Sequence, residues 1–183
     1  MVYILLADGF EEAEALVPAD LLRRAGVQVA LVGVTGEVVA GAHGIAVVSD
    51  LTVEQAQPEG MELLVVPGGL PGVTNVAASE KAMELVKAAA QADDCYLAAI
   101  CAAPSIVLGP VGILNGCKAT CYPGMEAGME GADAQKGYSV VVDGDIITGE
   151  GPGAAFDFGL TLVEVLKGAE TAKQVARDAC WRY

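Results

Sequence analysis

The amino-acid sequence predicts an α/β protein in which a mostly parallel, doubly wound sheet is covered by helices on both faces. Apolar runs of strand length alternate along the chain with segments of helical periodicity. Hydrophobic residues make up 54% of the composition and aromatic residues only 5%, which suits aliphatic strands that are buried on both faces. A length of 183 residues is enough for one complete core, so we expect residues 1–183 to form a single domain.

The expected strands are apolar runs bounded by glycine, proline or charged residues. Asp143-Gly144 predicts a hairpin between the last two of them, and Gly33–Ser49 reads as a pair of short strands joined by glycine turns. The main strands expected are Val2–Ala7, Val27–Val32, Leu63–Val66, Tyr96–Ile100, Lys118–Cys121, Tyr138–Val142 and Asp145–Thr148.

Four longer segments have helical signals. Ala13–Arg24 carries apolar residues along one side, and Pro18 within it either kinks the helix or marks its first turn. Ser79 is an N-cap residue for a helix that extends to Ala92. Pro152 begins a helix that runs to about Leu166, and Ala169–Ala179 forms the last one.

The composition also argues against some partners. The formal net charge of −14 disfavours nucleic acid, which requires a basic surface. The uncharged run Tyr96–Leu114 is long enough for a membrane span, but prolines and glycines interrupt it, so a strand, a turn and a short buried helix are expected instead. Five cysteines and no basic segment before the first apolar run favour the cytoplasm.

Cys101 is the strongest candidate for chemistry. It follows the expected strand Tyr96–Ile100, its neighbours are small, and a helix is expected to begin directly after it. Ligands of doubly wound folds bind at such strand ends, and a helix N-terminus lowers the pKa of a thiol there. The alternative is an inert cysteine buried in an apolar run.

Glu14 is the second candidate. Glu11, Glu12 and Glu14 lie where the first strand gives way to the first helix, so one of them can point inward at the same edge as Cys101. The alternative is that these carboxylates are exposed and merely favour the helix N-terminus.

Other motifs carry weaker signals. Gly68-Gly69 can present backbone N–H groups to an oxyanion, whereas Gly149–Gly153 lacks the lysine of a phosphate-binding loop. His43, the only histidine, is remote in sequence from Cys101, and Cys117 and Cys121 have no second pair to complete a zinc site. We therefore expect neither a cofactor nor a metal.

Four motifs together resemble the ThiJ/PfpI family (the DJ-one superfamily), and most closely its protein-deglycase branch. The motifs are Gly9-Phe10-Glu11-Glu12-Ala13-Glu14, Val66-Pro67-Gly68-Gly69, Ala98-Ala99-Ile100-Cys101-Ala102-Ala103-Pro104 and Gly151-Pro152-Gly153. The resemblance implies a flavodoxin-like three-layer sandwich, a cysteine on a strand-to-helix nucleophile elbow, and a homodimer.

The resemblance also implies roles for single residues. Cys101 matches the reactive cysteine and Glu14 its protonated partner, while Gly69 and Ala102 match backbone donors. Tyr122 and Arg24 are possible pocket residues, and Arg24 lies in a helix near the dimer interface. Two positions depart from the family. Ala102 replaces the histidine of the protease branch, which disfavours protease activity. Tyr122 replaces a histidine near the cysteine of well-known deglycases, so Glu14 would have to move the proton.

These matches lead to two functional hypotheses. The first is a cofactor-independent deglycase or glyoxalase that acts on reactive dicarbonyls such as methylglyoxal and glyoxal, or on their adducts with proteins and other amines. The second is an oxidative-stress redox sensor or chaperone that works through oxidation of Cys101.

Overall fold

A seven-stranded sheet forms the centre of the computed structural model, which describes residues 1–182. All neighbouring strands are parallel except the edge pair β10 and β11. Across the sheet the order is β10, β11, β7, β6, β1, β2, β5. The strands are β1 (Val2–Leu6), β2 (Val29–Gly33), β5 (Leu51–Thr52), β6 (Leu63–Val66), β7 (Tyr96–Ile100), β10 (Val140–Asp143) and β11 (Ile146–Gly149).

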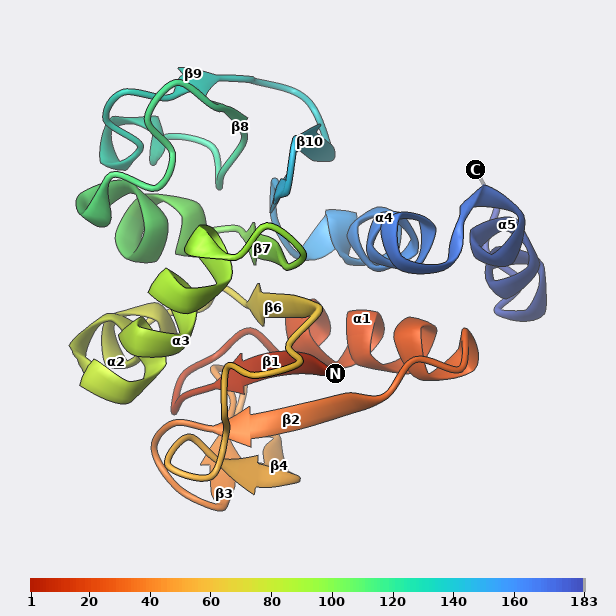
Figure 1. The fold of residues 1–183 in the computed structure, drawn as a ribbon, viewed down its shortest axis with the longest axis horizontal. Coiled ribbons are helices and arrows are strands. Elements are labelled where there is room, and N and C mark those ends of the chain that lie inside the picture. The colour runs from red at the N-terminus through yellow and green to blue at the C-terminus, as the bar shows by residue number, and fades with distance from the viewer. Residues whose placement is uncertain (183) are drawn as a thin grey trace.

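Helices cover both faces of this sheet (Figure 1). One layer contains α1 (Glu12–Arg24), α4 (Ala155–Lys167) and α5 (Ala169–Asp178), and the other contains α2 (Gly72–Ala78) and α3 (Glu80–Gln91). Side chains of β1 alternate between the two layers, because successive residues of a strand point to opposite faces. The sheet is therefore buried on both sides, as its continuous aliphatic runs predict.

Most of the expected elements are confirmed. β6 and β7 have the bounds predicted from the sequence, and β10 and β11 form the antiparallel hairpin around Asp143-Gly144. The Oγ atom of Ser79 accepts a hydrogen bond from the backbone N–H of Ala82 at 3.2 Å, so it caps α3. The pair of short strands between Gly33 and Ser49 is an antiparallel hairpin of β3 (Val38–Ala40) and β4 (Ala46–Val48).

The structure corrects several predicted bounds. Lys118–Cys121 is not a four-residue strand: only β8 (Lys118–Ala119) is extended, and it pairs with β9 (Asp133–Ala134) outside the main sheet. β2 begins at Val29, because the N–H of Val27 still bonds to a carbonyl of α1. A short 3₁₀ turn over Pro152–Ala154 precedes α4.

The sequence does not predict α2, β5, β9 or the 3₁₀ turn Glu126–Gly128. All four are short and have weak periodic signals, so their formation depends on packing against the rest of the fold. Pro18 lies within α1, which already begins at Glu12, so it does not mark the first turn. Among residues 1–182, no helix combines the length and the apolar character needed to cross a bilayer.

The order of the strands reverses beside β1. From β1 the chain continues to β2 on one side, whereas β6 and β7 lie on the other. The segments that follow β1, β6 and β7 therefore meet at one edge of the sheet, where such folds bind ligands.

Candidate active site

Cys101 lies on a tight turn directly after β7. Its φ angle is +64°, a left-handed conformation that is unfavourable for a residue with a Cβ atom. Two hydrogen bonds hold this conformation: the N–H of Cys101 donates to the carbonyl of Gly149 at 2.9 Å, and its carbonyl accepts from the N–H of Tyr122 at 2.8 Å. A helix of five residues, Pro104–Leu108, follows the turn. This is the strand-to-helix elbow that the sequence predicts.

Glu14 projects from the first turn of α1 into the same edge of the sheet, and its side chain has no exposed surface. Its Oε2 atom accepts a hydrogen bond from the N–H of Gly68 at 2.8 Å, while Oε1 is buried without a hydrogen-bond partner. The carboxyl group is also a hydrogen-bonding partner of Cys101. The structure therefore brings together the two residues that the sequence singled out.

Gly68 makes this arrangement sterically possible. A Cβ atom added there would lie 2.6 Å from the Cβ atom of Cys101 and 2.6 Å from Oε2 of Glu14. Both distances are far below van der Waals contact, so no larger residue fits without displacing one of the pair. The sequence predicts Gly68 only as a possible backbone N–H donor to an oxyanion. In the structure its N–H bonds to Glu14 instead.

Burial changes the acidity of Glu14. It raises the pKa of the carboxyl group from 4.5 to about 7, and the negative charge of Glu11 adds to the increase. The hydrogen bonds from Gly68 and Cys101 oppose it. Glu14 therefore changes protonation state near neutral pH, where such a group can take up and release protons.

The thiol of Cys101 is also harder to ionise than an ordinary cysteine. Burial raises its pKa to about 12, and the charge of Glu14 and its hydrogen bond to Glu14 contribute. The sequence predicted the opposite, a pKa lowered by a helix dipole. That prediction is wrong because burial disfavours the thiolate and the Glu14 carboxylate lies beside it.

Gly69 and Ala102 lie where the predicted backbone donors should be. Their N–H groups hydrogen-bond to the Cys101 side chain and partly oppose the rise in its pKa. Gly69 has a φ angle of +94°, and an added Cβ atom would collide with the backbone of Gly9, Phe10 and Glu11. Only glycine can therefore place this N–H group so close to the loop that follows β1.

Tyr122 and Arg24, the other predicted pocket residues, lie in different places. Tyr122 is 47% exposed and lines a pocket of about 400 Å³ together with Glu150 and the segment 151–154. Because its N–H bonds to the Cys101 carbonyl, this pocket lies beside the elbow. Arg24 does not line the pocket; it forms an exposed ion pair with Asp20 at 2.7 Å, one turn back on α1.

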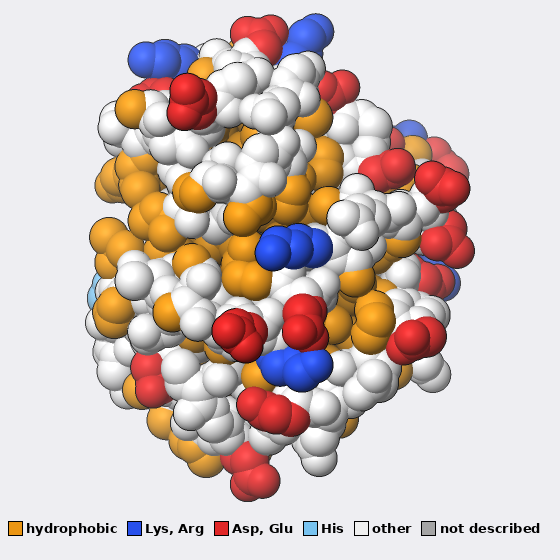
Figure 2. Space-filling view, turned by 60° about the vertical axis from the view of Figure 1, so that its left-hand side comes forward, with side chains coloured by type: hydrophobic (Ala, Val, Ile, Leu, Met, Phe, Trp, Pro, Cys, Tyr) orange, Lys and Arg blue, Asp and Glu red, His pale blue; other side chains and the backbone are white. Residues whose placement is uncertain are grey.

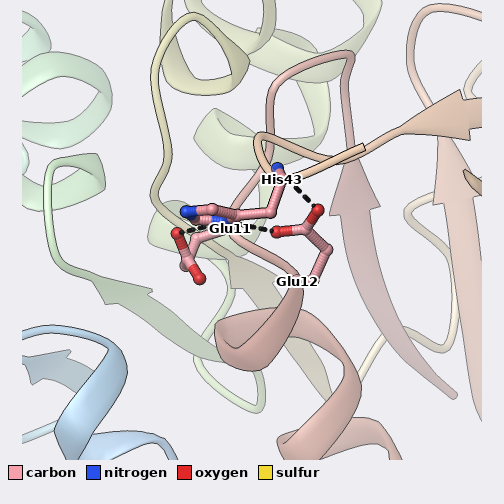
Figure 3. Close-up of side chains that lie close together, drawn as sticks. All are labelled: Glu11, Glu12 and His43. Atoms are coloured by element: carbon pink, nitrogen blue, oxygen red, sulfur yellow. Dashed lines mark hydrogen bonds and ion pairs between the residues drawn. The ribbon is translucent and has the colours of Figure 1, made fainter. Parts of the chain in front are cut away.

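His43 is close to the first helix despite its distance in sequence. Its Nδ1 atom lies 2.9 Å from Oε2 of Glu12 and 3.6 Å from Oε2 of Glu11, at the beginning of α1 (Figure 3). The sequence does not predict this cluster. Gly41 leaves room for it, because an added Cβ atom there would collide with the Glu12 carboxylate.

The remaining cysteines have separate local partners. Sγ of Cys117 donates to the carbonyl of Ile113, and Sγ of Cys121 donates to the carbonyl of Tyr122. The thiols of Cys117 and Cys121 both have raised pKa values because they are buried. Within residues 1–182, the group suited to holding a metal ion is Glu11, Glu12 and His43.

Comparison with known proteins places this geometry in a family. The sequence profile of the DJ-1/PfpI family matches residues 1–165. The Parkinson disease protein 7 homolog of Danio rerio is 39% identical over 177 residues, which cover 94% of this chain and 92% of the relative. The crystal structure of Drosophila melanogaster DJ-1beta superimposes with a TM-score of 0.94 at 33% identity, over 100% of this chain and 98% of that one.

Two further relatives are named for an activity. A glutathione-independent glyoxalase of Caenorhabditis elegans is 32% identical and covers 97% of this chain and 94% of its own length. A deglycase of Pyrococcus abyssi is 34% identical and covers 91% of this chain and 99% of its own length. The flavodoxin-like fold and the match over nearly the whole chain agree, and the chain belongs to the DJ-1/PfpI family.

Proposed function

We propose that this protein is a cysteine-dependent, cofactor-independent enzyme of the deglycase or glyoxalase type. Its substrates would be reactive dicarbonyls, such as methylglyoxal and glyoxal, or their adducts. The observation that carries the proposal is the fully buried Glu14 carboxyl group, which lies beside the thiol of Cys101 at Gly68. The relatives named as a glyoxalase and a deglycase support the same kind of chemistry.

The first step is attack by sulfur on the aldehyde carbon. Near neutral pH the thiol is protonated and Glu14 is partly ionised, because their pKa values are about 12 and about 7. The Glu14 carboxylate accepts the thiol proton as the S–C bond forms, and passes it to the aldehyde oxygen to complete a hemithioacetal. The N–H groups of Gly69 and Ala102 would stabilise charge at this site as it develops.

The second step moves a proton between adjacent carbons. The carboxylate of Glu14 removes the proton from the hemithioacetal carbon and returns it to the neighbouring carbon, so an enediol becomes a thioester. Water then cleaves the thioester, which releases a 2-hydroxy acid and restores the Cys101 thiol. No external oxidant is required, because one carbon is oxidised while its neighbour is reduced.

The pocket beside the elbow suits a small uncharged substrate. Its volume is about 400 Å³, and its lining among the described residues includes Glu150 but no lysine or arginine. Methylglyoxal and glyoxal carry no charge, so they would enter without repulsion from Glu150 or Glu14. Glycated amines and thiols present the same carbons, and their reaction would release the repaired amine or thiol.

The purified protein should convert methylglyoxal to lactate without glutathione. Cys101→Ser, which replaces the nucleophile with a poorer one of similar size, should abolish lactate formation, whereas Cys180→Ser changes an exposed thiol away from the site and should leave it unchanged. Equal turnover by the wild type and the Cys101→Ser variant would refute the proposal.

A second candidate function is a redox sensor. Cys101 is partly buried, unlike the fully buried Cys95 and Cys121, so peroxide can reach its sulfur. A neutral Glu14 would donate a hydrogen bond to a sulfinate. Mild peroxide should then add two oxygens to Cys101 before any other thiol is modified, as measured by mass spectrometry. Earlier oxidation of Cys117, Cys121 or Cys180 would contradict this function.

We also propose that the protein is a homodimer in which α1 and the β3–β4 hairpin lie at the interface. The hairpin exposes three aliphatic side chains, Val38, Ile45 and Val48, with exposed fractions between 54% and 72%. An exposed apolar cluster of this kind favours burial against a second copy. Figure 2 shows another side of the molecule, at the left of Figure 1 with α2 and α3, where apolar side chains also reach the surface. Sedimentation of an 18.6 kDa monomer at micromolar concentration would contradict the dimer.

A further inference from the structure

Three metal-ligating atoms converge beside the start of α1. They are Nδ1 of His43 and one carboxylate oxygen each from Glu11 and Glu12, and all lie within 4.8 Å of one another (Figure 3). His43 comes from the loop of the β3–β4 hairpin, whereas the two glutamates come from the segment that follows β1. Imidazole nitrogen with carboxylate oxygen is a ligand set suited to a first-row divalent cation.

The Glu12 carboxylate is prepared to act as a ligand. The residue is 5% exposed, and both of its carboxylate oxygens have partners in the His43 loop. Its Oε1 atom accepts the backbone N–H groups of His43 at 2.8 Å and Ile45 at 3.3 Å. Oε2 faces the imidazole instead. One oxygen is thus anchored to the backbone while the other points at His43, as in metal sites with an outer hydrogen-bonded layer.

The spacing of the atoms fits a tetrahedral ion. Bonds of about 2.0–2.1 Å to zinc place neighbouring ligand atoms about 3.3–3.4 Å apart. The distance from His43 Nδ1 is 2.9 Å to Oε2 of Glu12 and 3.6 Å to Oε2 of Glu11. Shifts of a few tenths of an ångström would bring both separations to the required value.

The charge of these three residues is an independent reason to expect a bound cation. Among residues 1–182, His43 is the only basic group within ion-pair distance of Glu11 or Glu12. Two carboxylates beside one imidazole keep a net negative charge in either protonation state of His43, and a divalent cation offsets it. The side chain of His43 is 67% exposed in the single chain, so ions in solution can reach it there.

We propose that Glu11, Glu12 and His43 bind one Zn²⁺ ion, with water at the fourth position. Binding replaces the proton or hydrogen bond at Nδ1 of His43 with a coordinate bond to the metal. The site is distinct from the Cys101 thiol, and its existence does not depend on the reaction proposed above.

The unique histidine makes the test direct, because His43 supplies the only imidazole ring signals in an NMR spectrum of the chain. Titration with Zn²⁺ is best done in the Cys101→Ser variant, which removes the partly buried thiol as a competing ligand. The ring resonances should shift and stop changing at one equivalent of metal. Ring signals that stay in place up to millimolar Zn²⁺ would overturn the proposal.

Calorimetry with matched variants distinguishes zinc bound at Glu11, Glu12 and His43 from zinc bound at a cysteine thiol. In the same background, His43→Ala and Glu12→Gln should each weaken Zn²⁺ binding by about tenfold or more. Glu37→Gln removes an equal charge from an exposed residue near the hairpin and should leave the affinity unchanged. Because Glu12 also anchors the loop, circular dichroism should show that its variant is folded; His43→Ala changes an exposed side chain and provides a second test. Parent affinity in both variants would mean that zinc binds elsewhere.

Discussion

The carboxyl group of Glu14 and the thiol of Cys101 meet at the same side of Gly68, where a single added Cβ atom would lie 2.6 Å from both Glu14 Oε2 and Cys101 Cβ and where Glu14 has no exposed surface. Burial raises the pKa of both groups, and the charge of Glu14 raises that of Cys101 further. The pair therefore titrates as a coupled unit in which the carboxyl group loses its proton first. This order makes Glu14 the base and Cys101 the protonated nucleophile at neutral pH.

Glu14→Gln should separate thiol acidity from catalysis. The amide keeps the shape of the carboxyl group but carries no charge, so the pKa of Cys101 should fall below about 12 and iodoacetamide should react faster at pH 8. The amide cannot carry a proton, so dicarbonyl turnover should fall by about two orders of magnitude or more.

Glu14→Leu provides the matched comparison. It removes the charge and also the hydrogen-bond donor, so its Cys101 pKa should lie above that of the Gln variant. Full turnover by the Gln variant would show that Glu14 is only a structural donor and that another group moves the proton.

The rate of turnover should depend on pH through Glu14. Because the ionised carboxylate is the form that accepts the thiol proton, kcat/KM should rise with pH through about 7 and then level off. Glu11→Gln removes the charge that contributes to the raised pKa, so the midpoint should move to lower pH. Measurement in the presence of a chelator keeps metal ions from obscuring the effect. A profile that is flat between pH 5 and 9 would contradict the assignment of the base.

The free energy of unfolding should also depend on the ionisation of Glu14, but it should fall over the pH range in which kcat/KM rises. The pKa of Glu14 is about 7 in the folded protein and 4.5 in its ordinary state, so unfolding releases a proton between these values. The stability that the protonated Glu14 contributes to the folded state is complete below pH 4.5 and is lost as pH rises through 7. The wild type should therefore lose about 2–3 kcal/mol of unfolding free energy relative to Glu14→Gln between pH 5 and 8.

Denaturant unfolding of both proteins at several pH values measures this difference. His43 also has a raised pKa, from its hydrogen bond to Glu12 and the nearby carboxylate charges, but it is present in both proteins, so its contribution cancels. A constant difference between the two proteins across this range would show that Glu14 is not desolvated in solution.

Gly68→Ala should inactivate the site without removing either functional side chain. The added methyl group would lie 2.6 Å from Cys101 Cβ and from Glu14 Oε2, so the pair must separate. Turnover should fall by at least tenfold and the Cys101 alkylation rate should change, while circular dichroism stays native. Gly26→Asn, at an exposed left-handed glycine after α1 with open space around it, adds a side chain away from the site and is the control. Wild-type turnover by the Gly68→Ala variant would contradict the close packing.

The class of fold and the location of the candidate site follow from the amino-acid sequence alone. Long aliphatic runs such as Leu63–Val66 and Tyr96–Ile100 form strands with the predicted bounds, because a run buried on both faces has few other stable conformations. Strand ends in a doubly wound sheet share one edge, so Cys101 and the glutamates after β1 were expected there.

How the residues at that edge interact depends on the packing of the folded chain. The rotation of α1 against the sheet sets the partner of each buried glutamate: Glu14 lies beside Cys101, whereas Glu12 faces His43 from the hairpin loop. The acidity of Cys101 likewise follows from its neighbours in space, since burial and the Glu14 charge raise its pKa. Periodicity and spacing describe one element at a time, and these properties arise where four segments meet.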